Sequence, residues 1–271
     1  MTELLGARRL RELFDRHGIR PRKELGQNFV VDPNTIRRIV EHAEIRPGTR
    51  VVEIGAGAGS LTLGLAEAGA RVTAVEFDRA LLPVLAETVG ELDEVEIVAA
   101  DALTFDFGSG GEAVVANLPY NIAVPLVMSV LARAPNIQSM TVMTQKEVGE
   151  RLAAAPGTKA YGSLSVMVRH RAEARVVMRV SRRAFYPVPG VDSVVVRLRR
   201  REGSDVDSVA LERVVRAAFA QRRKTLRNTL VPVAGDTARA EKMLEAAGVD
   251  PAARAEEVDL DGFAAIARQL G

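Results

Sequence analysis

The sequence predicts an α/β protein with a mainly parallel sheet covered by helices on both faces, followed by a small all-helical domain. Three observations support this prediction. From residue 51 onward, short apolar runs alternate with helix-forming segments, glycines stand at every second position after the first run, and the pattern changes to helices alone after about residue 203. Such alternation is typical of right-handed crossover units in a parallel sheet.

Two helices are predicted before the sheet. Leucines and Phe14 recur at helical spacing in residues 8–17, which predicts a short helix. After a polar, turn-rich segment, Asp32 followed by Pro33 is typical of an N-cap with proline at the first helical position. A second helix is therefore predicted to run to about Ala43.

The alternating region is predicted to contain four strands. They lie at residues 51–54, 72–76, 95–98 and 113–116, with a helix from Ser60 and another over residues 79–89. Ligands of parallel sheets gather at the carboxyl ends of the strands, and four residues fall there: Gly55, Glu76, Asp101 and Asn117. Asp101 can accept a hydrogen bond from an adenine amino group, although a lone aspartate after a strand is more often a turn residue.

Residues 50–62 contain the turn around which this site is organised. A β-branched run is followed by Gly55, Gly57 and Gly59 and then by a helix-forming segment, which indicates a strand, a tight turn and a helix. Glycine suits this turn because the chain needs unusual φ values and a bare backbone that a ligand can approach. A small molecule is therefore predicted to lie across it.

The residues beside the turn favour a positively charged ligand. The dinucleotide fingerprint needs a third glycine where Ser60 stands. Glu53 would repel a pyrophosphate, whereas it suits the sulfonium and α-amino groups of S-adenosylmethionine. Glu76, about 20 residues further on, can accept the ribose hydroxyl protons of either ligand. S-adenosylmethionine is the predicted cofactor, and a nicotinamide dinucleotide is a weaker alternative.

Residues 117–120, Asn-Leu-Pro-Tyr, point to chemistry on an exocyclic adenine amine. The lone pair of that amine is delocalised into the ring, so a protein should accept both amine hydrogens and aim the lone pair at the methyl donor. The side-chain oxygen of Asn117 and the carbonyl of Leu118 supply the two acceptors. Pro119 stiffens the backbone, and Tyr120 offers a stacking face for an extruded base. An ordinary asparagine-containing turn would explain these residues but not their place after the fourth strand.

Composition and charge narrow the class of protein. The chain has 271 residues, no cysteine, three histidines without metal-like spacing and a formal net charge of +2. No apolar run approaches the roughly 18 residues of a membrane helix, and charges interrupt the N-terminal 20 residues where a signal peptide would be apolar. We expect a cytoplasmic protein that binds neither membrane nor metal.

The helical domain is predicted to begin after a boundary at residues 203–204, so that the domains cover residues 1–203 and 204–271. Its helices are expected at about residues 208–220, continuing over 221–230, then 238–247 and 260–270. Basic residues cluster at residues 8–23, 197–201 and 222–227, which favours a polyanion-binding face, although each cluster alone is equally typical of a solvated surface. Four residues of the last cluster are predicted to bind RNA phosphates: Arg222, Arg223, Lys224 and Arg227.

Two motifs resemble those of the ribosomal RNA adenine N6,N6-dimethyltransferases. They are residues 53–62, Glu-Ile-Gly-x-Gly-x-Gly-x-Leu-Thr, and residues 117–122, Asn-Leu-Pro-Tyr-Asn-Ile. Further matching blocks lie at residues 25–29, 145–148, 151–152, 159–166, 191–195 and 221–228. The resemblance implies a Rossmann-like S-adenosylmethionine-dependent methyltransferase sheet. It also implies a monomer that dimethylates two adjacent adenosines in the 3′-terminal hairpin of 16S-type rRNA, within an immature 30S-type particle.

The resemblance also implies roles for single residues. Six of them would hold the cofactor: Asn28, the backbone at Val30, Gly55, Glu76, Asp101 and Asn117. Phe185 would stack on the target adenine opposite Tyr120, with core packing as its alternative role.

Two other functions remain open. One is the large-subunit branch of the family, which modifies one adenosine in 23S-type rRNA and confers macrolide resistance. Gln27, Asn28 and Phe29, together with the blocks at residues 159–166 and 221–228, favour the small-subunit branch. The other is a ribosome-assembly factor that keeps the fold and has lost the reaction, against which the intact Asn-Leu-Pro-Tyr quartet argues.

Overall fold

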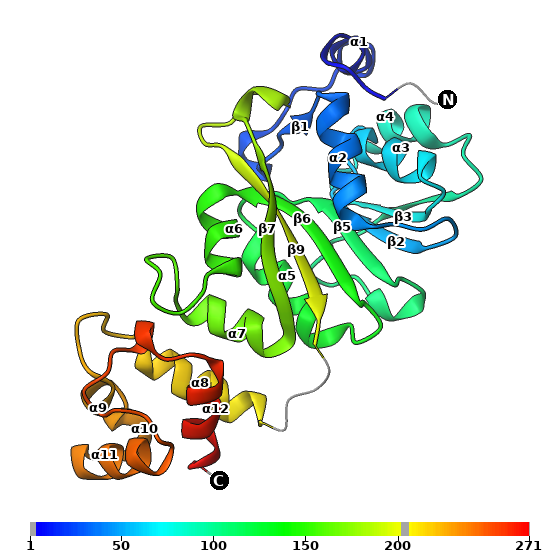
Figure 1. Cartoon of the computed structure of the whole chain (residues 1–271). Helices are drawn as coiled ribbons and strands as arrows, with labels where there is room; N and C mark the ends of the chain where they lie inside the picture. Colours follow the sequence, from blue (N-terminus) through cyan, green and yellow to red (C-terminus); the bar gives the residue numbers. More distant parts are fainter. Residues whose placement is uncertain (1–3, 202–205, 271) are drawn as a thin grey trace. The chain divides into compact units, whose positions relative to one another are not determined.

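The computed structural model describes residues 4–201 and 206–270 (Figure 1). The chain divides into two compact units. The first, here called the sheet unit, comprises Met1–Gly149 and Arg175–Arg200. The second, here called the helical unit, comprises Glu150–Ala174 and Arg201–Gly271.

A seven-stranded sheet forms the centre of the sheet unit, with the strand order β4-β3-β2-β5-β6-β9-β7. The strands are β2 (Arg50–Ile54), β3 (Arg71–Glu76), β4 (Val95–Ala99), β5 (Ala113–Asn117), β6 (Ser139–Gln145), β7 (Ala172–Val180) and β9 (Ser193–Arg200). Strands β2 to β6 run parallel to one another, and β9 pairs antiparallel with β6. This arrangement confirms the predicted parallel sheet and its first four strands, whereas β6, β7 and β9 were not predicted.

Helices connect the parallel strands as crossovers. They are α3 (Ser60–Glu67), α4 (Leu82–Val89) and α5 (Ala123–Arg133), preceded by α1 (Ala7–His17) and α2 (Pro33–Ala43). The Asp32 carboxylate accepts hydrogen bonds from the backbone N–H groups of Asn34 and Thr35, and Pro33 is the first residue of α2. The predicted N-cap of this helix is therefore confirmed.

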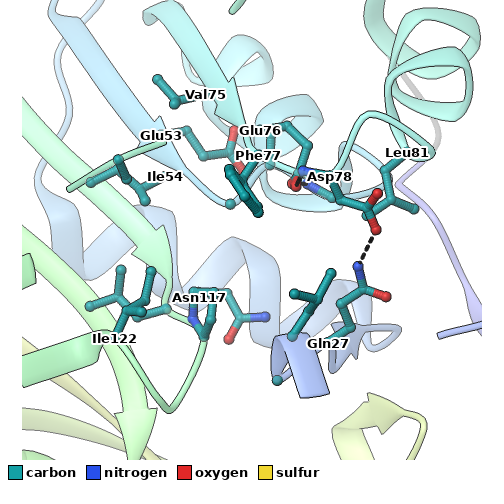
Figure 2. A pocket seen from close by; sticks show the side chains of 18 of the residues that line it. Gln27, Glu53, Ile54, Val75, Glu76, Phe77, Asp78, Leu81, Asn117 and Ile122 are labelled. Carbon is teal, nitrogen blue, oxygen red and sulfur yellow. Dashed lines mark hydrogen bonds between the residues drawn. The ribbon is translucent and has the colours of Figure 1, made fainter. Parts of the chain in front are cut away.

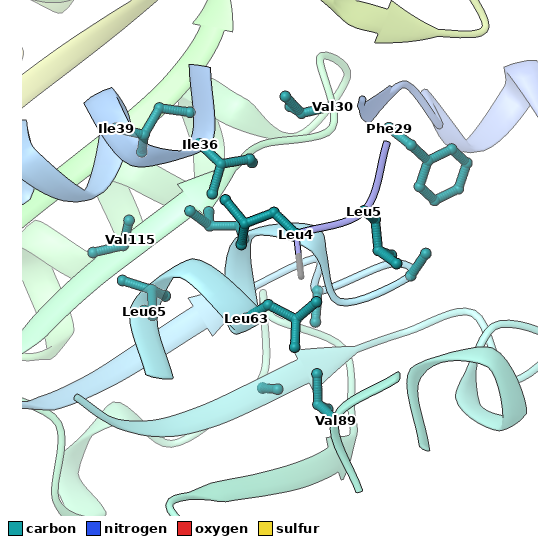
Figure 3. Close-up of a cluster of buried hydrophobic side chains, with 14 of the residues drawn as sticks. Leu4, Leu5, Phe29, Val30, Ile36, Ile39, Leu63, Leu65, Val89 and Val115 are labelled. Atoms are coloured by element: carbon teal, nitrogen blue, oxygen red, sulfur yellow. The ribbon is translucent and has the colours of Figure 1, made fainter. Parts of the chain in front are cut away.

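The segment between α1 and α2 is held against the rest of the sheet unit. Its strand β1 (Phe29–Val30) pairs antiparallel with β8 (Phe185–Tyr186), with Val30 opposite Phe185. Figure 3 shows Leu4 and Leu5 in the same buried apolar cluster as β1 and residues of α2 and α3. Leu4 and Leu5 therefore belong to the core of this unit.

The helical unit has a core of its own, built around the fully buried Phe263. Its helices are α7 (Ser163–Arg171), α8 (Ser208–Ala218), α9 (Leu226–Thr229), α10 (Val231–Ala234), α11 (Thr237–Ala246) and α12 (Leu260–Arg268), and α6 (Lys146–Ala153) leads into it. The described residues also contain the 3₁₀ turns η1 (Lys23–Leu25), η2 (Phe107–Ser109), η3 (Arg182–Ala184) and η4 (Ala255–Glu257). Among the described residues, no helix is long and apolar enough to cross a membrane.

The division of the chain differs from the predicted domains. Residues 150–174, assigned by the prediction to the sheet, belong to the helical unit, because Val166 of α7 and the neighbouring Tyr161 are buried in the core of that unit. The Tyr161 hydroxyl donates a hydrogen bond to the Val258 carbonyl at 2.9 Å. The predicted boundary at residues 203–204 lies outside the described residues.

The predicted helix over residues 221–230 is wrong in its first half. Residues 221–225 form a turn, and α9 begins only at Leu226. The Leu226 N–H donates to the Ala253 carbonyl at 2.8 Å, and the Arg227 N–H donates to the Pro251 carbonyl at 3.2 Å. These two N–H groups are bonded to a distant segment instead of continuing the hydrogen-bond ladder of α8.

Candidate functional site

A cavity of about 220 Å³ opens at the carboxyl ends of β2, β3 and β5. Its lining includes all six residues assigned to the cofactor and the whole of the quartet: Asn28, Val30, Gly55, Glu76, Asp101, Asn117, Leu118, Pro119 and Tyr120. Figure 2 shows side chains from β2, β3 and the end of β5 converging on this space. The topology thus brings together residues that lie up to about 90 positions apart in the chain.

The glycine turn between β2 and α3 has the backbone that the sequence predicted. Gly55, Gly57 and Gly59 have φ values of 71°, 60° and 87°, in the left-handed region that favours glycine. A Cβ atom on Gly57 would stand 3.0 Å from a ring carbon of Phe29. The turn is therefore left-handed and closely covered by β1, and a side chain at Gly57 would collide with that cover.

Glu76 joins the end of β3 to the glycine turn. Its side chain is 7% exposed and accepts hydrogen bonds from the Gly57 N–H at 2.8 Å and the Asp78 N–H at 2.7 Å. Burial raises the pKa of Glu76 in spite of these hydrogen bonds. A carboxylate offers about four acceptor positions, so acceptor capacity remains for a hydroxyl group of a ligand.

Glu53 lies at the floor of the cavity and is more deeply buried, at 1% exposed. Its Oε2 atom has no hydrogen-bond partner among the described residues. Burial, aided by the neighbouring Glu76 and opposed by the nearby Thr62, raises the pKa of Glu53 to about 8. Such a site favours a cationic group in the cavity, because a cation would stabilise the ionised carboxylate.

Asp78 holds the N-terminal segment next to the cavity. It is 6% exposed and accepts a hydrogen bond from Gln27 Nε2 at 2.7 Å, drawn as a dashed line in Figure 2, and it forms an ion pair with Arg22. The backbone N–H of Arg22 in turn donates to Gln27 Oε1 at 2.8 Å. Burial works to raise the pKa of Asp78, but the hydrogen bonds from Arg22 and Gln27 outweigh it and the pKa is lowered.

Asn117 and Tyr120 are each fixed by a hydrogen bond. Asn117 Nδ2 donates to the Asn28 carbonyl at 2.8 Å, which orients the amide and leaves Oδ1 as its acceptor. The Tyr120 hydroxyl shares a hydrogen bond of 2.8 Å with Ser193 Oγ. Burial raises the pKa of Tyr120, so this side chain offers an aromatic face and a neutral hydroxyl.

Phe185 does not lie where the family resemblance placed it. Its ring is 2% exposed, belongs to the apolar core and does not line the cavity, because β8 pairs with β1 and turns the ring inward. In this structure Phe185 therefore has the alternative role of core packing.

Asp101 has the turn role that the sequence predicted and also lines the cavity, while its hydrogen bond to an adenine amino group stays a prediction. Its Oδ1 accepts the Leu103 N–H at 2.9 Å, as expected for a turn aspartate, and the residue is exposed and lines the cavity.

The basic residues predicted to bind RNA lie in the helical unit and are exposed: Arg222, Arg223, Lys224 and Arg227. The Arg222 guanidinium donates to the Lys159 carbonyl at 3.5 Å, and that of Arg227 lies 3.6 Å from the Glu241 carboxylate. The structure does not bring them into the cavity lining.

Among the lining residues that sequence reasoning did not single out, Phe77 and Asp78 are the most informative. Phe77 lines the cavity and is 63% exposed. Asp78 received no role either. The available signal was their position directly after Glu76 at the end of β3.

The cavity, the glycine turn and the parallel sheet define a Rossmann-like methyltransferase. The profile of the family described as "Ribosomal RNA adenine dimethylase" matches residues 18–270. The chain belongs to this family.

Curated relatives carry the name "Ribosomal RNA small subunit methyltransferase A". The protein from Leifsonia xyli subsp. xyli is 47% identical over 273 residues, covering 97% of this chain and 98% of the relative. The protein from Kineococcus radiotolerans is 48% identical over 275 residues, covering 98% of this chain and 92% of the relative.

Solved structures with the same fold include an enzyme named as a 23S rRNA methyltransferase and one named as a dimethyladenosine transferase. The 23S rRNA methyltransferase ErmE superposes with a TM-score of 0.70 at 34% identity, covering 89% of this chain and 99% of that one. A dimethyladenosine transferase from Plasmodium falciparum superposes with a TM-score of 0.78 at 24% identity, covering 88% and 95%.

Proposed function

We propose that the protein is an S-adenosylmethionine-dependent enzyme that dimethylates N6 of two adjacent adenosines in the 3′-terminal hairpin of 16S-type rRNA. The observation that carries the proposal is the Asn-Leu-Pro-Tyr quartet at the cavity, with the Asn117 amide oriented by its hydrogen bond to the Asn28 carbonyl. The names of the relatives support the small-subunit substrate. We propose further that it acts as a cytoplasmic monomer on an immature 30S-type particle.

The residues at the cavity fit S-adenosylmethionine. The buried carboxylate of Glu53 has an orphaned oxygen, which suits a cation. Glu76 has acceptor capacity left for the ribose hydroxyls. Asn28, Val30 and Gly55 would hold the methionine end, and Asp101 would accept from the adenine amino group. When bound, the cofactor supplies a methyl group on a positively charged sulfur.

The quartet would prepare the target amine for attack. Asn117 Oδ1 accepts one amine hydrogen and the Leu118 carbonyl accepts the other, which turns the nitrogen lone pair away from both acceptors. Tyr120 stacks on the ring of the extruded base, and its hydrogen bond to Ser193 keeps the aromatic face in place. Because the methylated nitrogen loses its proton readily, the rate gain comes mostly from placement of the reacting atoms.

Replacement of Asn117 tests this function. Radiolabelled methyl transfer into immature small subunits should fall about 10²- to 10³-fold in Asn117→Ala, the usual cost of losing one preorganised group that stabilises the transition state. Asn34→Ala, an exposed asparagine in the first turn of α2, is the matched control and should keep full activity. Full activity of Asn117→Ala would remove this residue from its proposed role.

A second candidate function is the large-subunit reaction. The likeness to ErmE favours it, but the identity of 34% is lower than the 47% and 48% to the small-subunit relatives. Primer extension on small- and large-subunit RNA after methylation separates the two, since each predicts a stop at a different nucleotide. Cofactor binding in calorimetry without transfer to either RNA would instead indicate an assembly factor.

A further inference from the structure

We infer that the sheet unit carries its own phosphate-binding track for the RNA backbone, formed by Arg175 and Arg179 of β7 and by Arg183 of the following turn η3. The inference rests on the proposed RNA substrate and says where on this unit its backbone lies. None of these arginines belongs to the basic clusters that the sequence indicated.

The track occupies the outer face of an edge strand. β7 is the last strand of the sheet. Its side chains alternate, so Met178 and Val180 are buried in the core while Arg175 and Arg179 are exposed. Four residues of strand span about 13 Å, so the two guanidinium groups can engage phosphates of different nucleotides along one chain.

The three arginines form no ion pair with any carboxylate among the residues that the structure describes. Arginines elsewhere in the unit are neutralised, for example Arg50 by Glu112 at 2.9 Å. A guanidinium without a carboxylate partner keeps its planar set of donors available, which matches the two oxygens of a phosphate. The charge of β7 and η3 therefore complements a polyanion.

The track leads to the proposed base site through a chain of contacts. η3 continues directly into β8, which pairs with β1. The Arg182 N–H donates to Asp192 Oδ1 at 2.9 Å, and the adjacent Ser193 shares its hydrogen bond with Tyr120. A nucleotide strand whose adenine reaches Tyr120 can thus continue its backbone over η3 and along β7.

Charged residues on an edge strand also prevent association with other strands. This protection against strand pairing depends only on the charges of β7. It does not involve Arg183, which lies beyond the strand. It also leaves the salt dependence of RNA binding unchanged. The two roles therefore differ in a measurable quantity.

The experiment compares two full-length variants that each lose three positive charges. The track variant carries Arg175→Gln, Arg179→Gln and Arg183→Gln. The control carries Arg46→Gln, Arg50→Gln and Arg71→Gln, exposed residues at or before the amino ends of β2 and β3, the sheet end opposite the cavity. Binding to immature small subunits is measured by filter retention between 50 and 200 mM salt, concentrations at which several phosphate contacts give a steep dependence of about 10³–10⁵ in affinity.

The slope of log affinity against log salt should become shallower by about 2 to 3 in the track variant and should not change in the control. Calorimetry with S-adenosylmethionine should give wild-type affinity in both, which shows that the cavity is intact. The single variant Arg183→Gln, outside the sheet, should lower the slope by about 1 even if the triple variant does not fold.

Equal slopes for wild type, track variant and control would overturn the track. If the wild type still methylates the subunits in that case, the proposed function stands without the phosphate-binding track. A reduced slope in the track variant with no methyl transfer by any of the three proteins would support the track and overturn the proposed function.

Discussion

Replacing Glu53 with glutamine should stabilise the cofactor-free protein at neutral pH. The carboxyl titrates near 4.5 in the unfolded chain, while burial raises its folded pKa to about 8. Between these values the folded state binds more protons than the unfolded state, so the unfolding free energy falls as pH rises. From pH 4.5 to pH 7 the loss is about 3 kcal/mol, at about 1.4 kcal/mol per pH unit. Glutamine keeps the size of the side chain and removes the charge.

Equilibrium urea unfolding from pH 5 to pH 8 measures this effect. The unfolding free energy of the wild type should decline across the window, and that of Glu53→Gln should decline less and exceed it by up to about 3 kcal/mol at pH 7. Glu96→Gln, an exposed glutamate on β4, is the matched control and should follow the wild type. Parallel curves for Glu53→Gln and the wild type would refute the reasoning.

The same substitution should weaken the cofactor. A cation in the cavity stabilises the ionised form of Glu53, so binding of S-adenosylmethionine to the wild type at pH 7 should release a proton. Calorimetry in buffers of different ionisation enthalpy detects this release. Glu53→Gln should release fewer protons than the wild type and bind at least about tenfold more weakly, which corresponds to about 1.4 kcal/mol.

Three further substitutions test the geometry of the site and the fold. Asp78→Asn removes the ion pair with Arg22 and weakens the hydrogen bond from Gln27. The KM for S-adenosylmethionine should therefore rise several-fold with little change in kcat. An unchanged KM in steady-state kinetics would contradict this role. Gly57→Ala places a Cβ 3.0 Å from the ring of Phe29 at a φ of 60°, and it should lower the urea unfolding free energy by about 1–2 kcal/mol, whereas wild-type stability would show that the turn can relax. Arg200→Met removes hydrogen bonds to four backbone carbonyls at and just beyond the end of α5. It should lower the urea unfolding free energy by about 1–3 kcal/mol and leave the cofactor affinity in calorimetry unchanged. A loss of affinity would place Arg200 in the site instead.

Much of the cavity was predictable because its signals are local. The glycine turn follows from φ values that only glycine adopts readily, and the start of α2 follows from Asp32 and Pro33. Glu76 and Asn117 were placed by a general property of parallel sheets, whose carboxyl ends meet at one edge. These inferences need only neighbouring residues and the alternation of strands and helices.

The sequence by itself therefore determined the parallel sheet, its glycine turn and the placement of Glu76 and Asn117 at the cavity. Only the tertiary structure decided that Phe185 is buried opposite Val30, that residues 150–174 join the helical unit, and that Gln27 meets Asp78, 51 residues away. Each of these outcomes is a contact between segments far apart in the chain. Their free energy comes from burial and hydrogen bonding that exist only after those segments meet, so no local pattern records them.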